Sequence, residues 1–224
     1  MTSLCLEDPQ SSSAEGRLAF QRELLAAARR GNRQSIGELL TQYRNYLMLL
    51  ATMQIESRLQ PRVSPSDIVQ ETMLKAHRHF AQFRGQSERE LLAWLRQILV
   101  ANLARFVEHY LLAAKRDIRR EVSLERLGAA IESSSARLRS IAAAAGQSPS
   151  AAAQRREETV ELADRLAQLP AHYREVLVLR NIQGLSFEEA AAQLNRPIGA
   201  TRMLWLRAIE KLRALYRRAE EQDA

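Results

Sequence analysis

Residues 186–218 read SFEEAAAQLNRPIGATRMLWLRAIEKLRALYRR. Ser186 and Glu189 have the spacing of a capping box, in which each side chain bonds the other residue's backbone amide at a helix start. Pro197 interrupts the pattern, and a longer helix is predicted over residues 198–220. Two helices joined by a tight turn, the second of them basic, predict a helix-turn-helix unit.

The longer helix separates its packing side from its basic side. Positions at steps of three and four predict the side that packs on the preceding helices: Ile198, Thr201, Trp205, Ala208, Leu212 and Leu215. Residues 196–218 carry seven basic side chains and one acidic one, whereas residues 161–195 carry three basic and five acidic ones. This segregation favours a helix that enters the major groove of DNA, and a merely solvated face is the alternative. The candidate groove-facing residues are Arg196, Arg202, Met203, Leu206, Arg207 and Lys211.

The composition is that of a helical, basic protein. The chain has 224 residues, of which 46% are hydrophobic and 26% charged, with few glycines, prolines and aromatic residues. A net charge of +7 suggests an acidic partner such as nucleic acid, and a membrane surface is the other reading. No apolar stretch approaches the ~20 residues needed to span a bilayer. With no signal peptide and only Cys5, we expect a cytoplasmic protein without disulfides.

Helix-breaking residues and changes in composition divide the chain into four segments. We expect a loose tail over residues 1–17, a helical domain over 18–120, a linker over 121–154 and a second helical domain over 155–224. The linker is rich in Ser and Ala and poor in large apolar residues, so we expect it to bury little surface. A segment that threads into a partner is the alternative for it. The predicted fold is all-α, with two small helical domains joined by a flexible linker.

The first domain is predicted to contain four helices. They cover residues 18–30, a segment carrying Ile36 to Leu50, residues 64–80, and residues 88–114. Ser64 suits the N-cap of the third helix, Pro65 its first position, and Asp67 a place from which its carboxylate can reach back to the cap.

Two stretches of this domain resemble a known family. SPSDIVQETMLKAHRHF (64–80) and FRGQSERELLAWLRQILVANLARF (83–106) are similar to region 2 of bacterial sigma factors, in the extracytoplasmic-function group of the sigma-70 family. LPAHYREVLVLRNIQGLSFEEAA (169–191) resembles region 4 of the same group. The resemblance covers roughly residues 18–120 and 155–218. It implies a region 2 helical bundle and a region 4 helix-turn-helix, and a factor that directs promoter-specific initiation.

The resemblance implies a surface for RNA polymerase. On the helix that begins at Pro65, Asp67, Gln70, Glu71 and Leu74 share one sector of three- and four-residue spacing. In the family this sector binds the clamp helices of the β′ subunit, and the β flap is a second contact on the polymerase core. Arginines of the clamp would pair with these carboxylates.

The resemblance also implies a surface that captures a flipped base of the −10 element and guides the single strand. The candidate residues are Arg84, Gln86, Ser87 and Arg89 for the pocket, and Arg96, Asn102, Arg105, His109, Lys115, Arg116, Arg119 and Arg120 for the track. Phe80, Phe83 and Trp94 are expected in the core. Gly85 and Trp94 lie about two residues further apart than is usual in the family.

No catalytic or metal-binding constellation stands out, so we expect neither an enzyme nor a cofactor. The four histidines lack metal-ligand spacing. The expected partners are RNA polymerase core, promoter DNA and, as a further candidate, an anti-sigma protein; the free protein should be a monomer. The alternative is a stand-alone dimeric helix-turn-helix regulator, in which residues 18–120 serve dimerisation or sensing.

Overall fold

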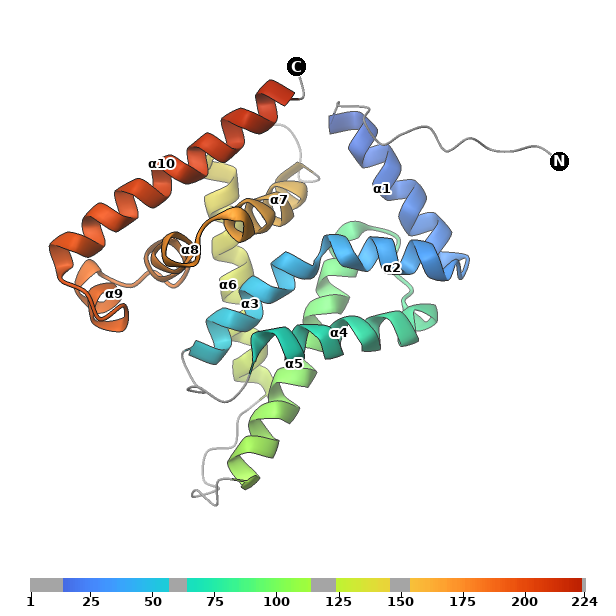
Figure 1. The fold of residues 1–224 in the computed structure, drawn as a ribbon. Helices are drawn as coiled ribbons and strands as arrows, with labels where there is room; N and C mark the ends of the chain where they lie inside the picture. Colours follow the sequence, from blue (N-terminus) through green and yellow to red (C-terminus); the bar gives the residue numbers. More distant parts are fainter. Residues whose placement is uncertain (1–13, 57–63, 114–123, 146–153, 223–224) are drawn as a thin grey trace.

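The computed structural model describes residues 14–56, 64–113, 124–145 and 154–222. Within these ranges every regular element is helical, which confirms the all-α prediction. In Figure 1 the α-helices pack together into one body, and the last helix, α10, lies along an outer edge.

The described residues between 14 and 113, called the first block below, contain five α-helices and one 3-10 turn. They are α1 (Ala14–Arg29), α2 (Arg33–Gln42), α3 (Arg44–Glu56), α4 (Pro65–His79), η1 (Phe80–Gln82) and α5 (Glu88–Ala113). α1 packs on α2, and α4 packs on both α3 and α5. The predicted tail covered residues 1–17, but residues 14–17 already belong to α1. Residues 1–13 and 114–123 lie outside the described part of the chain.

Local chemistry sets the starts of these helices. Gly31 adopts a left-handed φ of 88°, and the Asn32 carboxamide oxygen then accepts hydrogen bonds from two backbone amides, which caps α2. The predicted helix through Ile36 to Leu50 is divided at Tyr43, whose side chain is buried. Ser64 and Pro65 occupy the predicted positions at the start of α4, but Ser64 makes no capping hydrogen bond through its side chain.

A helix replaces much of the predicted linker. Residues 124–145 form α6 (Leu124–Ala145), which contacts α3, α5 and α7 and passes behind α3 in Figure 1. Leu127, Ile131 and Leu138 lie at helical spacing and are almost completely buried. The expectation of a segment that buries little surface therefore does not hold here, because three well-spaced large side chains are enough to anchor a helix rich in Ser and Ala.

Polar contacts also hold α6 in place. The hydroxyls of Tyr46 and Ser135 lie 2.9 Å apart, and both side chains are buried. On the other side of α6, Arg137 Nη1 donates to the carbonyl oxygens of Ile182 at 3.1 Å and Gln183 at 2.6 Å. α6 thus joins the first block to the last.

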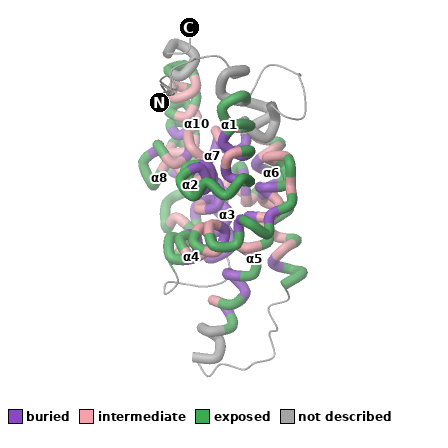
Figure 2. The backbone as a smooth tube through the Cα atoms, turned by 90° about the vertical axis from the view of Figure 1, so that its right-hand side faces the viewer, coloured by how far each residue is buried: buried purple, intermediate pink, exposed green. Residues whose placement is uncertain are grey.

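Residues 154–222, called the last block below, contain four α-helices and one π-helical turn. They are α7 (Gln154–Gln168), α8 (Ala171–Leu177), η2 (Val178–Ile182), α9 (Phe187–Gln193) and α10 (Ile198–Gln222). α10 packs on α7, α8 and α9. α3 contacts α7, so the buried residues of both blocks form one continuous core, seen as the purple centre of Figure 2.

Candidate functional site

The turn between α9 and α10 is built as its sequence predicts. Glu189 N donates to Ser186 Oγ at 3.1 Å, and Ser186 N donates to Glu189 Oε2 at 2.7 Å, which confirms the capping box. The backbone amide of Ser186, and to a smaller extent its side chain, hold the pKa of the Glu189 carboxyl below its usual value. Asn195 then adopts a left-handed φ of 50°, and α10 begins after Pro197. The turn therefore fixes the orientation of α10 relative to α9.

One side of α10 is anchored in the core. Thr201 and Ala208 are completely buried, and Thr201 Oγ1 donates to the carbonyl oxygen of Pro197. Trp205 lies against the core, and its indole Nε1 donates to Asn181 Oδ1 at 2.9 Å. The prediction that Trp205 packs rather than stacks on bases agrees with these contacts.

The opposite side of α10 faces solvent. Every residue that we predicted to face the groove is exposed: Arg196, Arg202, Met203, Leu206, Arg207 and Lys211. Arg202 is the most constrained of them, because its guanidinium lies 5.4 Å from the centre of the Phe187 ring and 3.7 Å from Glu188 Oε1. The surface that α10 offers is thus basic, with Met203 and Leu206 among the cations. Ile198, which we predicted to pack on the preceding helices, is instead 41% exposed in the first turn of α10.

A second exposed feature is the loop between η1 and α5. Glu90 Oε2 accepts hydrogen bonds from the backbone amides of Gln86 at 2.9 Å and Ser87 at 3.0 Å, and from Ser87 Oγ at 2.7 Å. These hydrogen bonds, first that of the Ser87 hydroxyl, lower the pKa of the Glu90 carboxyl. Our sequence reasoning missed Glu90, although Ser87 and Glu90 carry the S-x-x-E signature of a capping box.

Aromatic packing supports this loop from beneath. Phe80, Phe83 and Trp94 have ring centroids within 5.9 Å of one another, and the two phenylalanines are buried. Trp94 is half-buried against the core, so all three pack as expected. A Cβ at Gly85 would lie 2.4 Å from the Phe83 ring and 2.7 Å from Glu90 Cβ, so the loop needs glycine there.

The residues predicted to contact the −10 element are not on one continuous surface. Arg84, Gln86 and Arg89 are exposed on the loop and the start of α5, while Ser87 is half-buried. Arg96 and Arg105 are nine residues apart on α5, which places them on opposite sides of a helix with 3.6 residues per turn. The side chain of His109 and residues Lys115, Arg116, Arg119 and Arg120 lie outside the described part of the chain.

Two of these residues are held inside the fold. The Arg96 side chain is only 12% exposed, and its Nε lies 2.6 Å from Glu132 Oε1 of α6. Asn102 is completely buried; its Nδ2 donates to Thr72 Oγ1 at 2.9 Å, and its Oδ1 accepts from Lys75 Nζ at 2.5 Å. This corrects the expectation that Asn102 lines the track, because its carboxamide satisfies buried groups between α4 and α5.

The outer side of α4 carries the residues predicted to bind the polymerase core. Asp67 and Gln70 are exposed, and Leu74 is 42% exposed. Glu71 is half-buried, and its Oε1 lies 3.3 Å from Arg105 Nη2 and 3.7 Å from Lys75 Nζ. Asp67, Gln70 and Leu74 are therefore free to meet a partner, while Glu71 is already paired with cations of the chain itself.

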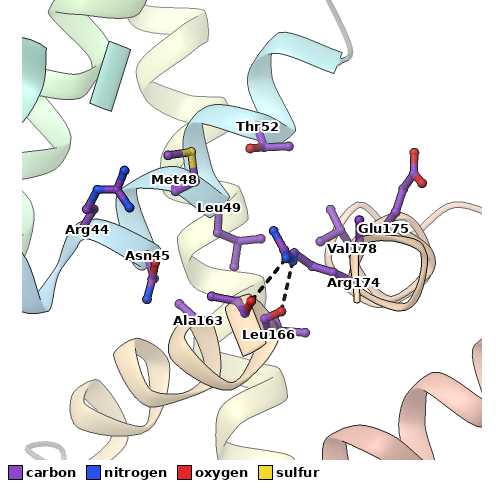
Figure 3. A pocket seen from close by; sticks show the side chains of 12 residues that line it. Arg44, Asn45, Met48, Leu49, Thr52, Ala163, Leu166, Arg174, Glu175 and Val178 are labelled. Carbon is purple, nitrogen blue, oxygen red and sulfur yellow. Dashed lines mark hydrogen bonds between the residues drawn. The ribbon is translucent and has the colours of Figure 1, made fainter. Parts of the chain in front are cut away.

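A cavity of about 560 Å³ lies between α3 on one side and α7 and α8 on the other (Figure 3). Arg174 reaches across its edge and donates to the carbonyl oxygens of Leu166, Ala167 and Leu169, which caps the end of α7. Nearby, Asn45 Nδ2 of α3 donates to Asp164 Oδ1 of α7 at 2.8 Å, and burial raises the pKa of Asp164. The cavity lies where the first block contacts the last block.

Neither a metal site nor a membrane span is present in the described part of the chain. No group of three or more His, Cys, Asp or Glu side chains is arranged to hold a metal ion there. Among the helices that the structure describes, none is long and apolar enough to cross a membrane.

The sequence of this chain is similar to those of known proteins. A family model described as "Sigma-70, region 4" matches residues 159–212, from α7 into α10. The ECF RNA polymerase sigma-E factor of Escherichia coli K12 is 30% identical over 204 residues, covering 84% of this chain and 90% of that protein. The RNA polymerase sigma-H factor of Pseudomonas aeruginosa is 27% identical over 190 residues, covering 85% and 90%.

Two solved structures match over most of this chain, with low TM-scores. The structure of the RsbN–BldN complex contains a chain 22% identical to this one, with a TM-score of 0.29, covering 85% of this chain and 98% of that chain. A structure of CnrH in complex with the cytosolic domain of CnrY gives 24% identity and a TM-score of 0.31, covering 88% and 96%.

Proposed function

This chain belongs to the extracytoplasmic-function group of bacterial RNA polymerase sigma factors, and we propose that its two ends divide the work of a sigma factor between them. The protein binds RNA polymerase core and directs transcription to particular promoters. The first block would hold the polymerase and open the −10 element, and α10 would read the −35 element. A stand-alone dimeric regulator is not favoured, because the relatives that match most of the chain are sigma factors.

The polymerase contact is proposed for the outer side of α4. Asp67 and Gln70 offer an exposed carboxylate and carboxamide, and Leu74 adds an apolar group beside them. An arginine of the β′ clamp helices can form charge-assisted hydrogen bonds with Asp67, and Leu74 can bury its side chain against the same helix. Glu71 would contribute charge, shared with Lys75 and Arg105.

The −10 contact is proposed for the loop that Glu90 organises. Arg84, Gln86 and Arg89 are exposed around a backbone whose Gln86 and Ser87 amides are fixed by the Glu90 carboxylate. A preorganised loop loses little conformational entropy when it binds an unstacked base. Arg105 can supply a phosphate contact on the other side of α5.

The observation that carries the −35 assignment is the exposure of all six predicted residues on or beside α10. The turn and the Thr201–Trp205–Ala208 side hold the helix firmly, and the exposed side remains available to a major groove. We further propose that the free protein is a cytoplasmic monomer, that the β flap contacts the last block, and that an anti-sigma protein is a further partner. The activity is that of a specificity subunit rather than an enzyme.

The polymerase contact is tested by charge reversal at one exposed position. Asp67→Lys should reduce core binding in a pull-down assay at least tenfold, because it sets a cation against the clamp arginines. Glu23→Lys, which reverses an exposed carboxylate on α1, is the matched control and should bind normally. If Asp67→Lys and Glu23→Lys bind core equally well, with both folded by circular dichroism, α4 is not the polymerase surface.

A further inference from the structure

Two large apolar side chains lie at the centre of the exposed side of α10. Met203 is 52% exposed and Leu206 is 48% exposed, whereas Thr201 and Ala208, on the opposite side of the helix, are completely buried. Three residues apart, Met203 and Leu206 are separated by about 60° around the helix axis. They therefore form one small apolar surface in the second and third turns of α10, which points away from the body.

We propose that Met203 and Leu206 contact the C5 methyl groups of thymines in the major groove, so that α10 selects A·T pairs at two positions of the upstream element. This inference rests on the proposed function of α10. It adds the class of base that the helix prefers and the side chains that make the choice.

The charges on either side of the apolar surface favour duplex DNA as its occupant. Arg202 and Arg207 are both exposed and project on opposite sides of Met203 and Leu206. In a major groove these cations meet the phosphates of the two strands, while the residues between them face the base edges. An apolar protein surface would instead have to cover the guanidinium of Arg207, and that of Arg202 with only Glu188 beside it.

The chemistry of the two side chains selects the base. Neither the Met203 thioether nor the Leu206 isobutyl group can donate a hydrogen bond. The edges of G, C and A in the major groove are polar, and thymine alone adds an apolar methyl group there. Contact with that methyl buries apolar surface on both sides, whereas contact with the other bases leaves their polar atoms unpaired.

The orientation of this surface is fixed by its neighbours. Arg202 is positioned over the Phe187 ring and beside Glu188 of α9, and Trp205 is bonded to Asn181. The segment that carries Met203 and Leu206 therefore has little freedom to rotate about its axis.

The test removes the C5 methyl groups of thymine from the upstream element. The full-length protein with core polymerase binds a promoter whose start site has been mapped by run-off transcription. In a second probe, deoxyuridine replaces thymidine at every position of the upstream element on both strands, which removes the C5 methyl groups and nothing else. We expect the affinity of the holoenzyme to fall about fourfold for each methyl group contacted, in a competition-binding assay.

Variants assign the effect to the two side chains. With Met203→Ala and Leu206→Ala combined, thymidine and deoxyuridine probes should bind equally, because the partner of the methyl groups is gone. Leu124→Ala truncates a side chain that is 54% exposed at the start of α6, and it should retain the full difference between the probes. All three side chains are exposed, so the variants keep the fold, which circular dichroism checks.

The outcomes separate this inference from the proposed function. Normal promoter binding with equal affinity for both probes overturns the methyl contact and leaves α10 as the −35 reader. A double variant that loses core affinity rather than thymine preference identifies a polymerase surface and also overturns it. If the holoenzyme binds no promoter at all, the proposed function is wrong, and the methyl contact is overturned as well.

Discussion

Arg96 of α5 and Glu132 of α6 form an ion pair in which Arg96 Nε lies 2.6 Å from Glu132 Oε1. Arg96 Nη1 also donates to the Tyr46 hydroxyl of α3 at 3.2 Å, and that hydroxyl contacts Ser135 of α6. A cation that the sequence suggested for DNA binding therefore connects three helices. α6, which lies outside the first block in the sequence, thus holds Arg96 of α5 in place.

The first prediction concerns the packing of α6. Ile131→Ala removes a completely buried side chain and should lower the free energy of unfolding by about 2–5 kcal/mol, because the cavity it leaves cannot fully collapse. Urea denaturation followed by circular dichroism measures the change. Leu124→Ala, at an exposed position of the same helix, is the control and should change stability little. Equal midpoints for the two variants would mean that residues 124–145 act as a loose linker in solution.

The second prediction is a pH dependence at Glu90. Hydrogen bonds lower the pKa of this carboxyl in the folded protein, below its usual value of 4.5, so the carboxylate stabilises the fold above that pH. The stabilisation should be present at neutral pH and be lost as the pH falls below 4.5 and through the lowered folded pKa. Wild type should thus be more stable than Glu90→Gln at neutral pH, and the difference should disappear in acid.

Denaturation at a series of pH values measures this difference. Glu108→Gln, an exposed position later in α5, is the matched control for the loss of a carboxylate and should change stability little at neutral pH. If the difference between wild type and Glu90→Gln were constant across the range, the carboxylate would not be what holds the loop.

The third prediction separates the two roles considered for Asn102. Asn102→Ala should lower the free energy of unfolding by about 1–3 kcal/mol, because it leaves Thr72 and Lys75 without their partner between α4 and α5. Thermal or urea denaturation of the variant gives the answer. A variant with wild-type stability and impaired promoter opening would instead restore Asn102 to the DNA surface.

The fourth prediction concerns phosphate contacts by α10. Promoter affinity of the holoenzyme should fall linearly with the logarithm of salt concentration, and Arg207→Ala should reduce the magnitude of that slope by about 1. Filter binding at several salt concentrations measures the slope. Arg22→Ala, an exposed cation on α1, should leave it unchanged. An unaltered slope in Arg207→Ala would place Arg207 away from the phosphates.

Local signals were sufficient to predict most of the helices and the helix-turn-helix. Ser186, Glu189 and Pro197 specify the turn through short-range hydrogen bonds and a missing amide, so sequence alone predicts it. The exposed side of α10 follows from periodicity, since Thr201 and Ala208 mark the opposite, buried side.

Contacts between distant segments could not be predicted in the same way. The burial of Asn102 depends on Thr72 and Lys75, some thirty residues earlier, and the neighbouring sequence does not reveal those partners. α6 was missed because its composition is dominated by Ser and Ala, although Leu127, Ile131 and Leu138 have helical spacing. Its stability comes from partners in both blocks, such as Tyr46 and Ile182.

Run-off transcription tests the central claim most directly. Purified bacterial core polymerase is combined with this protein and with genomic DNA fragments that include the protein's own upstream region. We predict a discrete start site that requires the protein and is absent with core alone, preceded by −10 and −35 elements. No transcript, together with a protein that is dimeric and binds duplex DNA without core, would contradict the account.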